Sequence, residues 1–313
     1  MNNIYAYTIQ LGNNMWYDKE EIPPEDPRYI YSRLPYRSCF NKDREAFRML
    51  VDFAKKEGFN TIIVHMGEGY MYKSHPEIAL EGAWTEDEIK QELSHIRELG
   101  MEPIPMLNFS AAHDMWLGKY ERMVGTDVYK TVCLELIDEV CRLFDKPKYF
   151  HLGLDEETYD SQKYLDFATV RNRVVMKRDM SDFFDVLRKN GVTPWIFYDF
   201  YKVSKDDFLE VVGKDVLLSD VTIRYTDKHN TEPVEYAELI EKGYKIVPMV
   251  THHLRVDIGT HVMPFLRKNI DKNAVVGVIN FPFLFCEDDN KYKLMYEATD
   301  TMQIVKNNAD YFE

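Results

Sequence analysis

Two adjacent carboxylates, Asp155 and Glu156, are the residues whose types and spacing point most directly to chemistry. Neighbouring carboxylates disfavour each other's ionisation, which raises the proton affinity of at least one of them. A carboxylic acid that is still protonated near neutral pH can donate its proton to a glycosidic oxygen, while an ionised neighbour stabilises positive charge. The pair therefore predicts a general acid and a charge stabiliser that act on a glycoside.

The pair directly follows Tyr149–Leu154, one of eight short runs rich in β-branched, aliphatic and aromatic residues. Such runs alternate with longer amphipathic stretches, which is typical of parallel strands joined by crossover helices. The sequence therefore predicts a single-domain α/β protein, a (β/α)₈ TIM barrel over residues 1–313, without an accessory domain. The other predicted strands are Ile4–Leu11, Thr61–Met66, Pro103–Leu107, Pro194–Tyr198, Val216–Ser219, Lys245–Val250 and Ala274–Asn280.

Glycines punctuate the predicted helices: Gly58, Gly100, Gly191 and Gly243 each end an amphipathic stretch shortly before a strand. The segment Thr85–Glu88 has the pattern of a capping box that begins a helix. A doubly wound open sheet is the competing architecture, but its phosphate-binding GxGxxG turn after the first strand is absent. The repeated helix, glycine and strand pattern favours the barrel.

In barrels of this kind the chemistry occurs at the carboxyl ends of the strands. Polar side chains follow most of the predicted strands, and aromatic residues that could stack on a sugar ring accompany them. We therefore expect a set of substrate-binding residues to surround the two carboxylates. They are His65, His113, Trp195, Tyr198, Asp199, Tyr225 and Glu287.

Other catalytic chemistries fit the sequence less well. Histidines near several strand ends could ligate zinc, but there is no HxH on a strand and no HExxH on a helix. The consecutive His252 and His253 would point to opposite faces of a strand. No GxSxG elbow is present, and the four cysteines form no CxxC pair. We therefore expect neither a metal nor a cofactor.

The formal net charge of −14 repels phosphate backbones and anionic lipids, so nucleic acids and membranes are not expected partners. No stretch of eighteen consecutive apolar residues occurs, and the first residues lack the pattern of a signal peptide. The chain as given is expected to be cytoplasmic, with a carbohydrate as its partner. The sequence leaves the oligomeric state open.

The segment His151–Glu156, HLGLDE, resembles the H-x-G-G-D-E motif of family 20 glycoside hydrolases, the β-N-acetylhexosaminidases. Three further segments are similar to that family in the same order, and the resemblance covers about half of the chain. Asn60–His65 is similar to its second-strand N-x-x-x-x-H pattern. Gly82–Thr85 and Ile104–His113 are similar to its G-A-Y-[ST] turn and its third-strand I-P-E-x-D-x-P-G-H segment.

The resemblance implies retaining hydrolysis from the non-reducing end, in which the substrate's own 2-acetamido oxygen attacks the anomeric carbon. It implies that Glu156 is the general acid and base and that Asp155 orients the acetamide and stabilises the intermediate. It further implies ring and hydroxyl contacts for Asp199, Glu287 and Trp195, and an acetamide donor in Tyr198 or Tyr225.

The sequence also departs from the family in four strands. Met106 and Asn108 replace the Glu and Asp of the third strand, which leaves His113 without carboxylates from its own segment. The sixth-strand Trp has no counterpart in 216–220. The seventh-strand Tyr-x-Asp is at best Arg255–Asp257, and the eighth-strand W-x-E is Phe-Cys-Glu at 285–287.

Two alternative functions remain open at this point. A glycosidase for sugars that lack the 2-acetamido group would pair Glu156 with another carboxylate such as Asp199 or Asp220. A non-catalytic carbohydrate-binding barrel would need neither Asp155 nor Glu156. The presence of both acidic residues argues against the latter.

Overall fold

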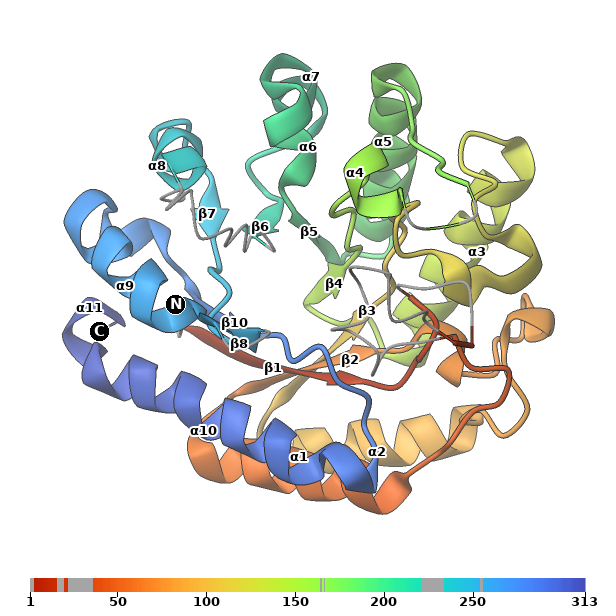
Figure 1. The fold of residues 1–313 in the computed structure, drawn as a ribbon, viewed down its shortest axis with the longest axis horizontal. Coiled ribbons are helices and arrows are strands. Elements are labelled where there is room, and N and C mark those ends of the chain that lie inside the picture. Colours follow the sequence, from red (N-terminus) through yellow and green to blue (C-terminus); the bar gives the residue numbers. More distant parts are fainter. Residues whose placement is uncertain are drawn as a thin grey trace.

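The computed structural model describes residues 3–15, 20–21, 36–163, 165, 167–220, 234–253 and 256–312. Within them eight parallel strands form a barrel with helices on its outside, shown in Figure 1. The predicted (β/α)₈ barrel is therefore confirmed. In chain order the strands are β1 (Ile4–Gln10), β2 (Thr61–His65), β3 (Glu102–Met106), β4 (Tyr149–His151), β5 (Thr193–Phe197), β6 (Leu217–Ser219), β7 (Lys245–Ile246) and β10 (Gly277–Asn280).

The strands are ordered β10-β1-β2-β3-β4-β5-β6-β7, so neighbours along the chain are neighbours in the barrel. The seam between β7 and β10 closes through two isolated parallel bridges, Ile246 with Val275 and Met249 with Ile279. The regular strand β7 is shorter than predicted, because Pro248 follows it and has no N–H to donate. By contrast, β2 pairs with β1 and with β3 over five residues each.

Alternation along the strands separates two apolar cores. One fills the inside of the barrel and includes Ala6, Ile63 and Trp195. The larger one lies between the strands and the outer helices, and Ile62 and Tyr198 belong to it. Trp195 of β5 and Tyr198, which directly follows this strand, therefore belong to different cores.

Four outer helices end where the sequence predicts, and one of them begins where it predicts. α1 (Arg44–Glu57) ends at Gly58, which has φ of 114°, and α2 (Glu86–Glu98) begins with the capping box of Thr85 and Glu88. Gly100, Gly191 and Gly243 also have positive φ. The remaining helices are α3 (Asp127–Leu143), α4 (Tyr159–Gln162), α5 (Arg173–Lys189), α6 (Asp199–Val203), α7 (Lys205–Val211), α8 (Val234–Glu241), α9 (Ile258–Asn269), α10 (Lys291–Asn307) and α11 (Ala309–Phe312).

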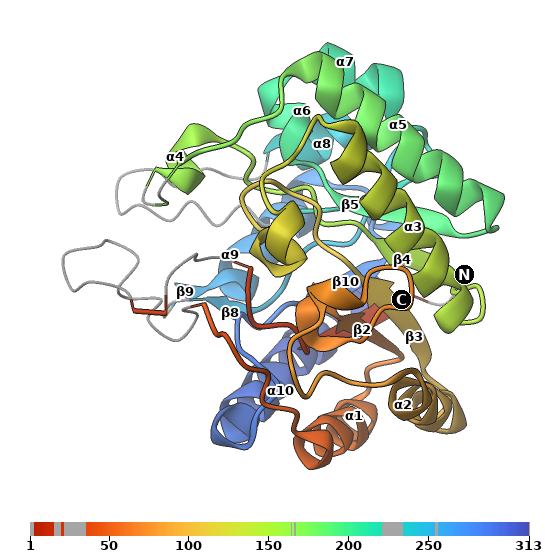
Figure 2. The ribbon, with the colours of Figure 1, turned by 90° about the vertical axis from the view of Figure 1, so that its right-hand side faces the viewer.

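Figure 2 separates the two ends of the barrel. The amino-terminal label, near the start of β1, lies on the right, whereas α4 and the hairpin of β8 (His252–His253) and β9 (Val256–Asp257) lie on the left. The left side is thus the end at which the parallel strands finish. Among the described helices, none combines the length and apolar composition needed to cross a lipid bilayer.

Candidate active site

The backbone after β4 takes an unusual path that places the two carboxylates. Gly153 and Leu154 both have φ of 68°, and Glu156 has φ of 52°, a region that non-glycine residues seldom occupy. Such strained conformations are typical of functional sites, where the surrounding structure enforces them. A Cβ on Gly153 would lie 2.0 Å from Oδ1 of Asn108. The glycine of the HLGLDE segment therefore makes room for Asn108.

Asn108 links the ends of β3 and β4. Its Oδ1 accepts hydrogen bonds from the backbone N–H groups of Ser110 and Leu154, at 3.0 and 3.2 Å. Its Nδ2 is then free to donate to Oδ1 of Asp155, at 2.7 Å. The hydroxyl of Ser110 donates to the backbone carbonyl of Asp155. The Asn that departs from the family pattern thus orients the first of the two carboxylates.

Asp155 is buried and forms an ion pair with His113, whose Nε2 lies 3.3 Å from Oδ2. Burial opposes ionisation of Asp155, but the charge of His113 and hydrogen bonds from His113 and Asn108 outweigh it. The pKa of Asp155 is therefore held below its usual range. Burial also opposes protonation of His113. The charge of Asp155 and the hydrogen bonds of His113 with Asp155 and Glu156 nevertheless raise the pKa of His113 to about 10. His113 thus gains carboxylate partners from β4 in place of those missing from its own segment.

Glu156 differs from Asp155 in being half exposed, with 48% of its side chain accessible. Its Oε2 lies 3.5 Å from Nε2 of His113, so the imidazole contacts both carboxylates. The ligand atoms of the three residues lie within 4.8 Å of one another, a spacing that a metal ion could bridge. The cluster thus brings together three titratable side chains, of which Glu156 alone is accessible to solvent.

A second, fully buried ion network lies directly behind the pair. Glu157 accepts from the backbone N–H of Ala111, at 2.9 Å, and from Nη2 of Arg171, at 2.6 Å. Arg171 also contacts Asp179 of α5 and donates to the carbonyl of Phe109, at 3.3 and 2.6 Å. Because breaking a buried pair leaves a charge without compensation, this network fixes the loops after β3 and β4 relative to each other.

Two neutral histidines face the inside of the barrel close enough to respond to the charge of Asp155. Burial lowers the pKa of both His65 and His151 to about 3. Nδ1 of His151 accepts from the N–H of Gly153, at 3.1 Å, whereas His65 has no hydrogen-bond partner among the described residues. From the sequence, His151 is predicted only as the first residue of the HLGLDE motif and not as a site residue.

Trp195 and Tyr198 are fully buried and lie on opposite faces of the β5 segment. Nε1 of Trp195 donates to Oγ of Ser219, at 2.8 Å, inside the barrel. The hydroxyl of Tyr198 donates to Oδ2 of Asp220, at 2.9 Å, on the outer side. Neither ring presents an exposed face, because strand alternation sends both into packed cores. Both predicted binding residues therefore lie in packed cores, and neither ring is accessible to solvent.

Asp199 lies close enough to Asp155 and Glu156 to respond to their charges, and one of its carboxylate oxygens makes no hydrogen bond to the described residues. Its Oδ2 is buried and has no hydrogen-bond partner among the described residues. Burial raises the pKa of Asp199 to about 7; Lys202 opposes this shift, and Asp220, Asp155 and Glu156 add to it. Lys202 lies 2.9 Å from Asp220 and 3.9 Å from Asp199. Lys202 was missed in the sequence, since a lone lysine after a strand carries no distinctive signal.

Glu287 lies in the segment after β10 and forms an ion pair with Arg37. The guanidinium of Arg37 lies 4.5 Å from the ring centre of Phe285. The backbone N–H of Arg37 donates to Oδ1 of Asn14, at 2.7 Å. This pair joins the segments that follow the first and last strands. Tyr225, the remaining predicted binding residue, lies outside the described residues, as does Arg255 of the seventh-strand segment.

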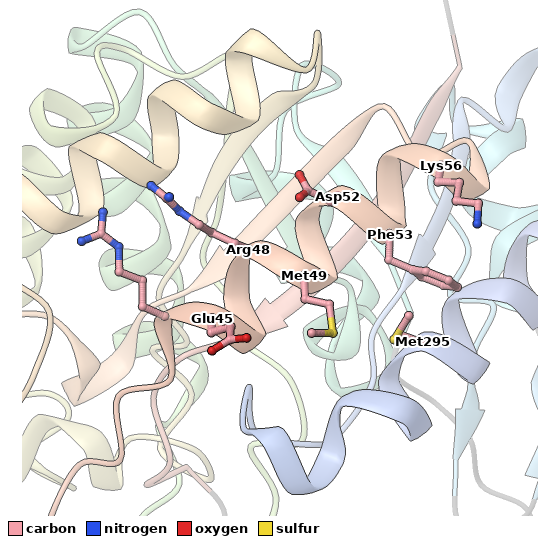
Figure 3. A pocket seen from close by; sticks show the side chains of 8 residues that line it. Glu45, Arg48, Met49, Asp52, Phe53, Lys56 and Met295 are labelled. Carbon is pink, nitrogen blue, oxygen red and sulfur yellow. The ribbon is translucent and has the colours of Figure 1, made fainter.

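Figure 3 shows a groove between α1 and α10 on the outer surface of the barrel. Arg48, Met49, Asp52 and Phe53 of α1 line it together with Met295 of α10. None of the predicted site residues contributes to this groove. The predicted site residues that the structure brings into contact are His113, Asp155 and Glu156, just after β4 and in the loop after β3.

No protein-family model matches this sequence, and no curated protein matches it. Solved structures do match it. The β-N-acetylhexosaminidase of Bacteroides fragilis is similar with a TM-score of 0.65 at 14% identity, over 96% of this chain and 65% of that one. Dispersin B is similar with a TM-score of 0.60 at 13% identity, over 98% of this chain and 100% of that one. The Streptomyces plicatus β-hexosaminidase in complex with N-acetylglucosamine is similar with a TM-score of 0.65 at 11% identity, over 96% of this chain and 63% of that one.

The chain spans 65% of the Bacteroides enzyme and 48% of the Flavobacterium johnsoniae chitobiase, which is also similar. At such low identities the likeness concerns the fold. The fold is that of the family 20 glycoside hydrolases, and the resemblance predicted from the sequence is confirmed at this level. The chain therefore has a glycosidase-like barrel.

Proposed function

We propose that this chain is an exo-acting glycoside hydrolase similar to the β-N-acetylhexosaminidases, which retains anomeric configuration through substrate-assisted catalysis. The observation that carries the proposal is the cluster at the end of β4. A buried, ionised Asp155 lies beside a half-exposed Glu156, and the protonated His113 contacts both. The reaction requires one carboxylate that stays ionised and a second, accessible carboxyl group that donates a proton.

In the first step the substrate's acetamide oxygen forms a bond to the anomeric carbon while the glycosidic C–O bond breaks. Glu156 donates its proton to the departing oxygen, so the leaving group departs as an alcohol. Positive charge develops on the acetamide, whose N–H faces Asp155 in this proposal. Asp155 is suited to that role because its pKa is held below the usual range, and a preorganised anion stabilises developing positive charge.

In the second step the ionised Glu156 removes a proton from water, whose oxygen attacks the anomeric carbon. The bond to the acetamide oxygen breaks, which restores the acetamide and the acid form of Glu156. Two inversions at one carbon give net retention. The 48% accessibility of the Glu156 side chain lets the same group reach first the leaving oxygen and then water.

Two further carboxylates are positioned to bind ring hydroxyls in this proposal. Asp199 offers the buried Oδ2 that has no partner among the described residues, and Glu287 is held by an ion pair with Arg37. His65 offers two ring nitrogens that are likewise unpartnered within the described chain. Asp199 and His65 would each give a hydroxyl a hydrogen bond that the protein itself does not use.

The test is release of nitrophenol from the β-glycosides of N-acetylglucosamine, N-acetylgalactosamine, glucose and galactose. The double variant Asp155→Asn/Glu156→Gln is the control for contaminating activity, because nitrophenol can depart without full protonation and Glu156→Gln alone would keep part of the turnover. We expect turnover of the two acetamido sugars alone. Turnover of glucose or galactose in their place would contradict the acetamide mechanism, and no turnover of any of the four would contradict hydrolysis altogether.

The role of Asp155 is tested by an N-acetyl-thiazoline analogue of the cyclic intermediate. Such an analogue should bind far more tightly than the product sugar, because it uses interactions made only along the reaction path. Asp155→Asn should weaken the analogue more than the product sugar. Equal weakening of both ligands would remove Asp155 from the proposed role.

A further inference from the structure

The outward face of α1 presents a stripe of six side chains along the groove of Figure 3. The opposite face of the helix is buried against the barrel, and residues three and four apart share a face of a helix. Four members of the stripe are charged and exposed, and two are apolar and half-buried. In order along the helix they are Glu45, Arg48, Met49, Asp52, Phe53 and Lys56.

The apolar part of the stripe continues onto α10. Met49 and Phe53 lie one turn apart, and Met295 of α10 lies beside them in the groove. Tyr292 and Tyr296, which flank Met295 on the same helix, are 74% and 63% exposed. Exposed apolar surface of this kind marks interaction sites, and aromatic residues, methionine and arginine are enriched at interfaces between proteins. The composition of this face therefore fits a protein partner.

The charged part of the stripe alternates in sign along the helix. Glu45 is negative, Arg48 is positive, Asp52 is negative and Lys56 is positive. The four charges sum to zero, whereas the whole chain has a net charge of −14. Two copies of the chain therefore repel each other over much of their surface, but not where two such stripes meet. The charge pattern thus favours a second copy of this chain as the partner.

An alternating pattern of this kind is complementary to itself when one copy is turned around. A two-fold axis brings the same patch of two copies together, and an axis beside residues 50 and 51 places the two α1 helices antiparallel. Residues at nearly equal distances on either side of that point then face each other. The pairs across the axis are Glu45 with Lys56, Arg48 with Asp52, and Met49 with Phe53. Each charge thus meets its opposite, and each apolar side chain meets another.

The helices beside α1 agree with this arrangement, because such an axis keeps each side of the stripe on the same side in both copies. Arg48 and Asp52 lie on the α2 side, where they pair with Glu92, at 2.8 Å, and with His95, at 2.7 Å. The apolar side chains lie on the α10 side, where Met295 adjoins them. Figure 2 shows α1 between these two helices. Charged pairs therefore form along one edge of the interface and apolar pairs along the other.

Arg48 and Asp52 retain polar atoms for a partner. Arg48 uses Nε to bind Glu92, and Asp52 uses Oδ1 to bind His95. The Nη groups of Arg48 and Oδ2 of Asp52 make no hydrogen bond to the described residues, and the two side chains are 48% and 58% exposed. Because contacts with α2 already restrict both side chains, a partner that binds them loses little free energy to ordering.

We propose that the outward stripe of α1, together with the adjoining face of α10, is the interface of a two-fold symmetric homodimer in which the two α1 helices pack antiparallel. The proposal is independent of the proposed hydrolysis, since none of the candidate site residues lines this groove. The occupant is a second copy because the stripe is complementary in charge to itself.

The test is sedimentation velocity over a range of concentrations, which should show a dimer with twice the 37.1 kDa mass of one chain. Asp52→Arg should raise the dissociation constant of the dimer about a hundredfold, because like charges then face each other at two symmetric positions. Arg48→Asp should act in the same way. The double variant Arg48→Asp/Asp52→Arg exchanges the two charges, so its dissociation constant should return to within about tenfold of the wild-type value.

Asp185→Arg is the matched control, since Asp185 is 71% exposed on α5 and its substitution changes the net charge by the same amount. It should leave the dimer intact, and circular dichroism should show every variant folded. A wild-type monomer at every concentration would overturn the interface. A dimer that tolerates both single reversals would place the contact on another face. Loss of the dimer in both single variants without recovery in the double variant would refute the pairing of Arg48 with Asp52, and with it the antiparallel arrangement.

Discussion

The imidazole of His113 lies 3.3 Å from the carboxylate of Asp155, and each group keeps the other charged. His113 has a pKa of about 10 and Asp155 a pKa below its usual range, so the pair is a buried ion pair across the neutral pH range. Removing one partner from a buried pair leaves the other charge uncompensated. The anion that we assign to the intermediate therefore depends on a histidine from a different loop.

His113→Gln should shift the acid limb of kcat to higher pH. Without the cation, the pKa of Asp155 rises, so Asp155 becomes protonated, and activity is lost, at a higher pH than in the wild type. The measurement is a pH profile of kcat on an N-acetylglucosaminide. His95→Gln serves as a control, because His95 pairs with Asp52 of α1, outside the candidate site. An acid limb at the same pH in His113→Gln and wild type would contradict the coupling.

Glu156→Gln should lower turnover of substrates with poor leaving groups by about 10²–10⁴-fold, the usual contribution of general acid catalysis. Activated aryl leaving groups need less protonation and should lose less. The measurement is kcat for a series of aryl glycosides with leaving groups of different pKa. A loss independent of the leaving group would remove Glu156 from the acid role.

Gly153→Ala should destabilise the protein and abolish turnover together. The added Cβ would lie 2.0 Å from Oδ1 of Asn108, which orients Asp155, and the residue has φ of 68°. Gly191→Ala is a matched control with φ of 73° and no atom within 4 Å of the added Cβ. The control should lose about 1 kcal/mol of unfolding free energy from backbone strain alone and keep its activity. Similar behaviour of the two variants would show that the contact with Asn108 is unimportant.

His65→Phe should make the protein less sensitive to mild acid. The pKa of His65 is about 3 in the folded protein and about 6.5 in an unfolded chain. Between those values the unfolded state binds a proton that the folded state does not, so the free energy of unfolding falls as pH falls from 6.5 towards 3. Denaturant titrations at pH 7 and pH 5 should show the variant losing about 1–2 kcal/mol less than the wild type. Parallel losses would contradict the neutral buried state of His65.

The strands were the most predictable part of the fold. Runs such as Thr61–His65 are buried along their whole length and contain β-branched residues, which only strands inside a covered sheet combine. The left-handed glycines Gly58 and Gly191 were equally visible, because that conformation is nearly a glycine property. The early end of β7 at Ile246 was harder to predict. Pro248 interrupts the hydrogen bonds of the strand, but the run of apolar residues continues past it.

The members of the candidate site were more predictable than the contacts between them. Asp155 and Glu156 were found because they are adjacent, whereas their contact with His113 spans more than forty residues and depends on the loop after β3. Asn108 looked like the loss of an acid, yet it supplies the hydrogen bond that orients Asp155. The burial of Trp195 follows from strand alternation, which the residue type alone does not reveal.

The seam of the barrel has a consequence for the exchange of backbone hydrogens with solvent. Isolated bridges join β7 to β10, while β2 is bonded over five residues to each of its neighbours. Regions with fewer cooperative backbone hydrogen bonds open locally at lower free energy. Deuterium should therefore enter the amides of Val250 and Val276, which are bonded across the seam, before those of Ile62 and Val64. Such an opening would occur in the wall of the barrel opposite β4, and it would displace neither Asp155 nor Glu156.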